Sequence, residues 1–277
     1  MISTEICFRP DALTGTDIAE VIKNDLGFEG KYIEARPCLG LSRFKRKEHI
    51  AKIGRIVDSY PRVSVSDTSL KPLPQGQTFS SKRFDPHVDV LSWHTNSPRA
   101  DRVIESIALR SPSFSTAYVH EWDDVYWQTE EQVDAYEEAG REYSPDEVVE
   151  HPLFGRAIDN SKKPGRQDVF PGMLIQPSWK MWFGPWAFNY LPKELLLSFR
   201  DAHLVEERKG LVFIQLFEHL EMYEEEESRR RQQSFRDFMN LDELLTQSGE
   251  IFDRDLAPLL DSEASPENRY FTIESTS

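Results

Sequence analysis

Short apolar runs of changing periodicity limit the folds open to this chain. Ile2–Phe8, Val88–His94 and Leu211–Phe217 each have the length of one strand and lie close to Pro or Gly. Stretches with apolar residues at helical spacing lie between them, including Thr16–Leu26 and Arg99–Leu109. Because these patterns do not alternate in a regular βαβ rhythm, they predict an α+β fold with a mixed or antiparallel sheet and packed helices.

The same patterns predict further elements. Strands are expected at Lys31–Cys38 and Ser115–Trp122, and helices at Arg46–Tyr60, Pro192–Phe199 and Ser228–Leu245. The segment 66–83, rich in Ser, Pro, Gly and Gln, is expected to be a loop. With 277 residues the chain is long enough for one large domain or two. We predict a single α+β domain over residues 1–277, or two closely associated halves, with a possible boundary in the 66–83 loop.

The distribution of apolar residues also bears on location. No apolar stretch approaches the ~20 residues of a membrane helix, and the N-terminus does not show the basic-then-apolar pattern of a signal peptide. We therefore expect a cytoplasmic protein with no membrane partner. The formal net charge of −15, from 48 acidic and 33 basic residues, repels nucleic acid and attracts basic surfaces. Nucleic acid is accordingly not an expected partner.

The negative charge is concentrated between Glu121 and Glu150. This segment contains twelve Asp or Glu residues and one basic residue, Arg141, so its formal charge is −12 + 1 = −11. Aromatic and apolar residues are interleaved with the carboxylates, namely Trp122, Val125, Tyr126, Trp127, Val133, Tyr136 and Tyr143. A purely disordered acidic tail would lack them. The segment is therefore predicted to fold.

Carboxylates beside aromatic rings form a combination that protein interfaces use, because charge steers a basic partner and the rings supply contact area. The residues predicted to bind a partner are Trp122, Asp123, Asp124, Glu130, Glu131, Asp134 and Glu138. The alternative is an amphipathic helix over Glu130–Gly140 whose aromatic residues face the core and whose charges are solvated. A second acidic cluster, Glu224–Glu227, precedes Arg229–Arg231 and is expected to begin a helix, because its charge suits the helix dipole.

The search for catalytic motifs finds none. The chain lacks G-x-S-x-G, phosphate-binding glycine motifs and the His or Cys spacing of zinc sites. We therefore expect no catalytic residues, no metal and no cofactor. One alternative is a metal-dependent enzyme, in which two strand ends would bring together Asp85, His87, Asp89, His94, His120, Glu121, Asp123 and Asp124. A non-enzymatic adaptor is the other alternative.

The C-terminal part carries a resemblance to a known family. The segments Trp186–Leu191, Leu195–Phe199, Gly210–Leu216 and Arg230–Leu245 resemble the C-terminal part of immunity protein 52 of bacterial polymorphic toxin systems. The resemblance implies an α+β protein that neutralises a toxin by binding it, since such proteins are encoded beside restriction-endonuclease-fold toxins. It carries over no binding residue.

The resemblance and the charge together predict the function. Nuclease toxins bind nucleic acid in basic clefts, and an acidic inhibitor surface suits such a cleft. We expect an immunity protein, as found beside toxins of type VI secretion, that neutralises a secreted toxin by direct binding. The expected partner is a basic nuclease domain.

Overall fold

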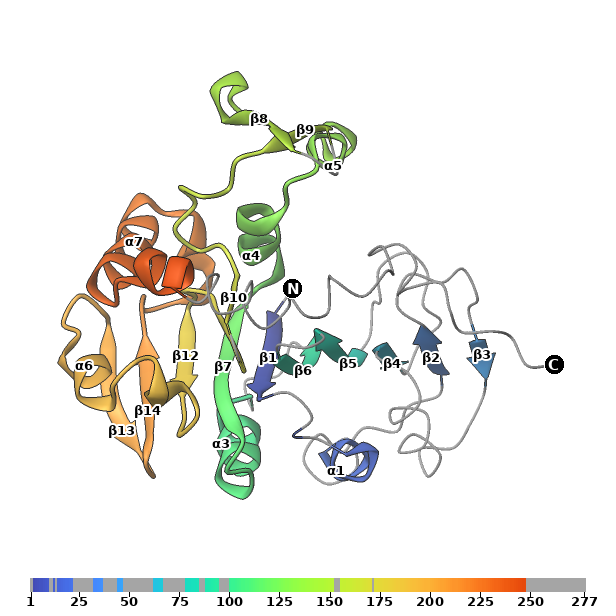
Figure 1. The fold of residues 1–277 in the computed structure, drawn as a ribbon, viewed down its shortest axis with the longest axis vertical. Helices are drawn as coiled ribbons and strands as arrows, with labels where there is room; N and C mark the ends of the chain where they lie inside the picture. Colours follow the sequence, from blue (N-terminus) through green and yellow to red (C-terminus); the bar gives the residue numbers. More distant parts are fainter. Residues whose placement is uncertain are drawn as a thin grey trace.

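The computed structural model describes residues 2–9, 12, 14–21, 32–36, 44–46, 62–66, 78–84, 88–94, 100–151, 155–170 and 172–247. Within them, ten strands form one sheet in which every recorded pair is antiparallel (Figure 1). From one edge to the other the order is β13 (Leu204–Arg208), β14 (Leu211–Gln215), β12 (Lys180–Phe183), β7 (Phe114–Glu121), β1 (Ile2–Phe8), β6 (Val88–His94), β5 (Thr78–Phe84), β4 (Arg62–Ser66), β2 (Tyr32–Arg36) and β3 (Phe44–Arg46).

Helices and two small hairpins complete the described part of the chain. The α-helices are α1 (Gly15–Glu20), α3 (Ala100–Arg110), α4 (Trp122–Thr129), α5 (Val133–Ala139), α6 (Lys193–Ser198) and α7 (Glu226–Phe238). The 3-10 helices are η3 (Pro145–Glu147), η4 (Ala187–Asn189) and η5 (Leu220–Glu224), and the hairpins pair β8 (Val148–His151) with β9 (Gly155–Ile158) and β10 (Asp168–Phe170) with β11 (Met173–Ile175). None of the described helices is long and apolar enough to cross a membrane. The mixture of helices with an antiparallel sheet confirms the α+β prediction.

Each face of the sheet has its own core, because successive side chains of a strand point to opposite faces. Ile6 and Phe8 of β1 pack on the face that α1 and α3 cover, where Ile104 of α3 is fully buried. Cys7 points to the other face, in the core that contains the β10–β11 hairpin, α6 and Phe235 of α7. The central strand β1 therefore contributes to both cores. It pairs with β6 on one side and β7 on the other.

Most elements predicted from local apolar patterns are present. β1 and β6 have the predicted bounds, and the expected strand over Lys31–Cys38 contains β2. The predicted helices over Arg99–Leu109 and Pro192–Phe199 correspond to α3 and α6 within one residue at each end.

Three predictions of secondary structure were wrong in part. Residues 78–83, expected in the 66–83 loop, belong to β5, because this segment has β4 and β6 on either side to bond with, although its serines do not favour a strand. The expected helix over Ser228–Leu245 is interrupted at Asn240, which has φ +51°. Arg46, the expected start of a helix, ends β3, and residues 47–60 lie outside the described residues. The division into domains remains a prediction.

Two glycines adopt backbone conformations that a side chain would strain. Gly210, with φ +89°, follows Lys209, with φ +52°, in the turn between β13 and β14, and no described atom lies within 4 Å of the place of its missing Cβ. Gly172, with φ +77°, lies in the turn between β10 and β11 against the indole of Trp186. A Cβ on Gly172 would lie 2.0 Å from Nε1 of Trp186. The positive φ angle favours glycine at both positions. At Gly172 the missing Cβ also leaves room for the indole of Trp186.

Gly172→Ala is expected to lower the free energy of unfolding more than Gly210→Ala does. At Gly210 the added methyl group introduces only backbone strain, about 1–2 kcal/mol. At Gly172 it must also displace Trp186, which adds on the order of 1–3 kcal/mol. Urea unfolding of both variants, followed by tryptophan fluorescence, measures the difference. If both variants lose the same free energy of unfolding, Trp186 moves aside without an energetic penalty.

Candidate partner-binding surface

A small folded unit extends from one end of the sheet. β7 ends at Glu121, and the chain then forms α4, α5, η3 and the β8–β9 hairpin before it returns to the sheet. Figure 1 shows α5 and the hairpin beyond α4, away from the sheet strands. We name residues 122–158 the acidic projection, of which the structure describes all except 152–154. Two stems join it to the rest of the molecule: its own first helix, α4, and the segment 159–168 that follows it.

Aromatic side chains form the core of the acidic projection. Val133, Tyr136 and Ile158 are buried there, and Trp127 and Tyr143 pack against them. The rings of Trp127 and Tyr136 meet edge to face with centroids 5.0 Å apart. The hydroxyl of Tyr136 donates a hydrogen bond to the carbonyl of Trp127 at 2.8 Å, which satisfies the polar end of a buried ring. The segment is therefore folded, as its sequence predicts.

α7 presents a buried polar stripe to the first stem. Arg229, Gln232 and Arg236 lie on one face of α7, because they are three and four residues apart. Arg229 donates a hydrogen bond to Oδ1 of Asp124 in α4, and Nε2 of Gln232 donates to Oδ2 of Asp124 at 3.3 Å. Within α4, Nε2 of Gln128 donates to Oδ1 of Asp124 at 2.5 Å. The carboxylate of Asp124, 2% exposed, thus has three side-chain donors.

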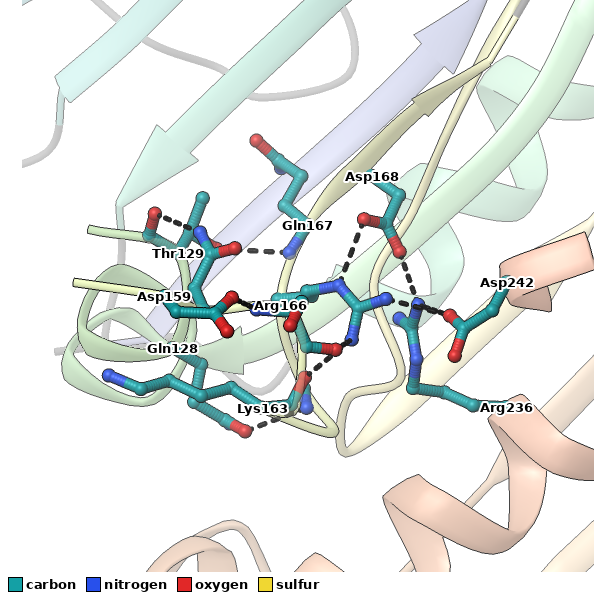
Figure 2. A network of polar contacts seen from close by, with 12 residues as sticks. Gln128, Thr129, Asp159, Lys163, Arg166, Gln167, Asp168, Arg236 and Asp242 are labelled. Atoms are coloured by element: carbon teal, nitrogen blue, oxygen red, sulfur yellow. Dashed lines mark hydrogen bonds and ion pairs between the residues drawn. The ribbon is translucent and has the colours of Figure 1, made fainter. Parts of the chain in front are cut away.

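The same helix holds the second stem through a network of two arginines and two aspartates (Figure 2). Arg166 of the second stem is 6% exposed, and its Nε and Nη2 donate to Asp168 at 3.2 Å and to Asp242 at 2.7 Å. Nη2 of Arg236 lies 2.7 Å from Oδ2 of Asp168 and 2.5 Å from Oδ1 of Asp242. Two positive and two negative groups therefore balance each other where the stem meets α7.

The two stems also bind each other directly. The side-chain oxygen of Gln128 accepts a hydrogen bond from the backbone N–H of Gly165 at 2.7 Å. The hydroxyl of Thr129 accepts one from the N–H of Gln167 at 3.0 Å (Figure 2). Nδ2 of Asn160 donates to the Thr129 carbonyl at 2.8 Å. The part of the acidic projection beyond α4 therefore begins and ends next to residues that are hydrogen-bonded to each other.

The seven residues predicted to bind a partner lie in three environments. Asp134 and Glu138 are exposed on α5. Half-buried positions are taken by Trp122, Asp123, Glu130 and Glu131. Asp124 is in the interior, where it binds α7, so it cannot supply a surface carboxylate and its assignment to the binding surface is corrected. Successive helix residues point about 100° apart, and nothing in the sequence shows which of the adjacent Asp123 and Asp124 faces inward.

Among the residues that the structure describes, most of the predicted surface carboxylates form no ion pair. Glu130 accepts hydrogen bonds from the backbone N–H groups of Glu131, at 3.0 Å, and Gln132, at 2.9 Å, just before α5. In the part of the chain that the structure describes, no ion pair forms at the predicted surface residues Glu130, Glu131, Asp134 and Glu138. These groups are therefore open to a cation from outside, and Glu130 also has a local structural role.

The second acidic segment lies beside the acidic projection, which the sequence did not indicate. Nη2 of Arg141 is 3.9 Å from Oε1 of Glu224 in η5. Burial, and then the charges of Glu224, Asp123 and Glu121, raise the pKa of Tyr223, so this ring lies among carboxylates of both segments. Glu226 and Glu227 occupy the first turn of α7, as predicted. The two acidic segments therefore form one surface.

The alternative metal-binding set is brought together only in part. His94 on β6 and His120 on β7 are both in register with Ser3 of β1, which lies between them. Asp85 and His87 lie outside the described residues. Over the ranges that the structure describes, no group of three or more His, Cys, Asp or Glu residues is arranged to hold a metal ion.

His120 is buried at the end of β7, where it faces a carboxylate. Its Nδ1 carries the proton that it donates to the Glu121 carbonyl at 3.0 Å, since a carbonyl can only accept. Nε2 is 3.8 Å from Oε2 of Glu5, which is too long for a hydrogen bond, so this interaction is electrostatic. Burial alone would lower the pKa of His120. Glu5, the bond to Glu121 and the charge of Asp124 together outweigh burial and raise that pKa.

Comparisons with known proteins identify no family. No protein-family model matches the chain, and no curated protein matches its sequence. One solved structure that it resembles is the Pseudomonas aeruginosa T6SS protein PA0821, with a TM-score of 0.42 and 11% sequence identity. The match covers 77% of this chain and 64% of that protein, less than two thirds of its length. This likeness is too distant to establish a shared fold, and the resemblance to immunity protein 52 remains a prediction from the sequence.

The free energy of unfolding is expected to fall as the pH rises above about 6.5, the ordinary pKa of histidine. The folded pKa of His120 is raised, so its stabilising effect is complete below the unfolded pKa and is lost as the pH passes the folded pKa. Urea unfolding at closely spaced pH values measures this slope, which should be smaller in His120→Gln. If the unfolding free energy of His120→Gln depends on pH as that of the parent does, other groups cause the pH dependence.

Arg229→Met is expected to lower the free energy of unfolding by about 3–5 kcal/mol, because it leaves the Asp124 carboxylate buried without its cation. Arg230→Met is the matched control: it changes the next residue of α7, whose partners Asp201 and Glu227 lie at the surface, and should have a much smaller effect. Asp124→Leu added to Arg229→Met should restore part of the loss, because it removes the unpaired charge but leaves the amides of Gln128 and Gln232 without this acceptor. Urea unfolding measures all three, and equal losses for the two arginine variants would contradict the importance of this contact.

Proposed function

We propose that this chain binds a basic protein through the acidic projection and blocks its activity without catalysing a reaction itself. The proposed partner is a secreted toxin with a basic, nucleic-acid-binding cleft, so the chain would act as its immunity protein. The observation that carries the proposal is the group of surface carboxylates, without ion pairs among the described residues, on a small folded unit that two stems hold at the end of the sheet.

The geometry suits recognition of a positively charged concave surface. Asp134 and Glu138 are one helical turn apart on the exposed face of α5, so they present two carboxylates side by side. α5 also lies away from the sheet, where a partner can surround it (Figure 1). Fixed charges of one sign raise the rate at which an oppositely charged partner associates.

A toxin as the partner is supported by the resemblance to immunity protein 52 of the segments Trp186–Leu191, Leu195–Phe199, Gly210–Leu216 and Arg230–Leu245. Those segments belong to β14, α6, α7 and their neighbours, outside the acidic projection. They would therefore support the binding surface instead of forming it. The absence of catalytic motifs from the sequence agrees with inhibition by binding.

A protection assay tests the proposed function. A toxin encoded next to this chain would be expressed in bacteria with and without it, and the chain is expected to restore growth. The two purified proteins should form a complex whose affinity falls as the salt concentration rises. The proposal is wrong if the toxin remains lethal in the presence of folded chain, or if the purified chain itself hydrolyses nucleic acid.

Charge reversal on α5 should slow the association of the two proteins. Asp134→Lys combined with Glu138→Lys is expected to reduce the association rate at low salt about tenfold or more, with little change in the dissociation rate, because rim charges act mainly by steering. Stopped-flow measurements at low and high salt would show the effect and its loss on screening.

Glu20→Lys combined with Glu194→Lys is the matched control. Both residues are exposed and lie outside the acidic projection, on α1 and α6, so the net charge changes by the same amount. If the control slows association equally, total charge determines the rate. If neither pair of substitutions has an effect, this surface is not the interface.

A further inference from the structure

A row of three aromatic rings lies along α4. Trp122 and Tyr126 are one helical turn apart and stack with their centroids 4.5 Å apart and their planes at 17°. Tyr126 meets Trp127 edge to face at 4.8 Å. All three side chains are half-buried and keep part of their surface in solvent. Aromatic faces next to carboxylates are the arrangement that binds organic cations.

The chain's own Arg141 occupies one end of this row. Its guanidinium carbon lies 4.8 Å from the centroid of Trp127, and its Nη2 is 3.9 Å from the carboxylate of Glu224. The end of α5 places it there: Gly140, with φ +65°, ends the helix, and the N–H of Arg141 donates to the Tyr136 carbonyl at 2.9 Å. Between residues 121 and 150, Arg141 is the one basic residue. It shows how this surface holds a guanidinium group, with a ring on one side and a carboxylate at the edge.

The other end of the row has the same components. Trp122 and Tyr126 supply the rings, and Asp123 supplies a carboxylate in the first turn of α4. Tyr223 of η5 lies near Asp123 and Glu224, since the charges of both raise its pKa in addition to its burial. Among the described residues, no cation lies over the ring of Trp122 or Tyr126.

We infer that the Trp122–Tyr126 end of the row binds an arginine side chain of the partner protein, as the Trp127 end holds Arg141. This inference rests on the proposed function and adds the chemical group that is recognised. Arginine suits the site better than lysine does, because its planar guanidinium group stacks on a ring and donates hydrogen bonds in the same plane to carboxylates. Arginine is also abundant on proteins that bind phosphate backbones.

Peptide binding tests the inference even before the partner is identified. A short arginine-rich peptide and a lysine-rich peptide of equal length and charge, each carrying a fluorescent label, are titrated with the full chain. We expect the arginine peptide to bind about 5- to 30-fold more tightly at the same salt concentration, because lysine can also sit over a ring but only a guanidinium group stacks flat on it while donating to a carboxylate. Equal affinities would overturn the inference.

Variants then locate the preference for arginine. Tyr126→Leu and Trp122→Leu keep an apolar side chain but remove a ring, so each should bring the arginine peptide to the affinity of the lysine peptide. Tyr126→Phe keeps the ring and should keep the preference. Tyr143→Leu is the matched control, because Tyr143 is a half-buried ring of the same acidic projection that lies outside the row. Circular dichroism and thermal unfolding establish that each variant is folded.

The outcomes separate this inference from the proposed function. Asp134→Lys combined with Glu138→Lys should weaken both peptides and leave their ratio unchanged, because those carboxylates supply only charge. If both peptides bind equally and depend on Asp134 and Glu138, the arginine site is wrong while binding through acidic charge stands. If the preference survives in both leucine variants, or if neither peptide binds, the arginine site is also wrong.

Discussion

The position of the acidic projection depends on polar side chains of one helix that pack against two other segments. Arg229 and Gln232 bind Asp124 of the first stem, and Arg236 binds Asp168 of the second. Hydrogen bonds between ionised groups are directional, so they fix the angle and register of each stem more closely than apolar contact alone would. Such groups add little net stability to a fold, but removing one member leaves its partner buried and unpaired. The interactions therefore specify the arrangement of the stems.

This arrangement explains how a strongly acidic segment can remain folded. Twelve carboxylates between residues 121 and 150 repel one another. The aromatic core around Tyr136 and the hydrogen bonds between the stems oppose that repulsion, and Arg141 compensates part of the charge next to Trp127. The remaining surface charges are held in place and face solvent. A surface of this kind keeps its field fixed in direction while it meets a partner, which favours rapid and selective association.

The sequence predicted what depends on local pattern and missed what depends on contacts between distant segments. Apolar periodicity predicted β1, β6 and α3 because each of these elements buries residues at a regular spacing. β5 was missed because its Ser-rich sequence is stabilised as a strand by its two neighbours. Within the candidate site, Asp134 and Glu138 are exposed, as both the interface prediction and the alternative of a solvated amphipathic helix require. The burial of Asp124 follows from its contact with Arg229, 105 positions away, which no local pattern encodes.

The hydrogen bond between Asn160 and the Thr129 carbonyl has a consequence for how this protein can change during evolution. It joins the end of α4 to the start of the second stem, and the side chains through which α7 anchors the two stems lie outside residues 130–158. A segment whose two ends adjoin can be lengthened, shortened or exchanged without altering the support beneath it. Proteins descended from this one could therefore carry different projections and acquire new partners while their sheet and α7 stay the same.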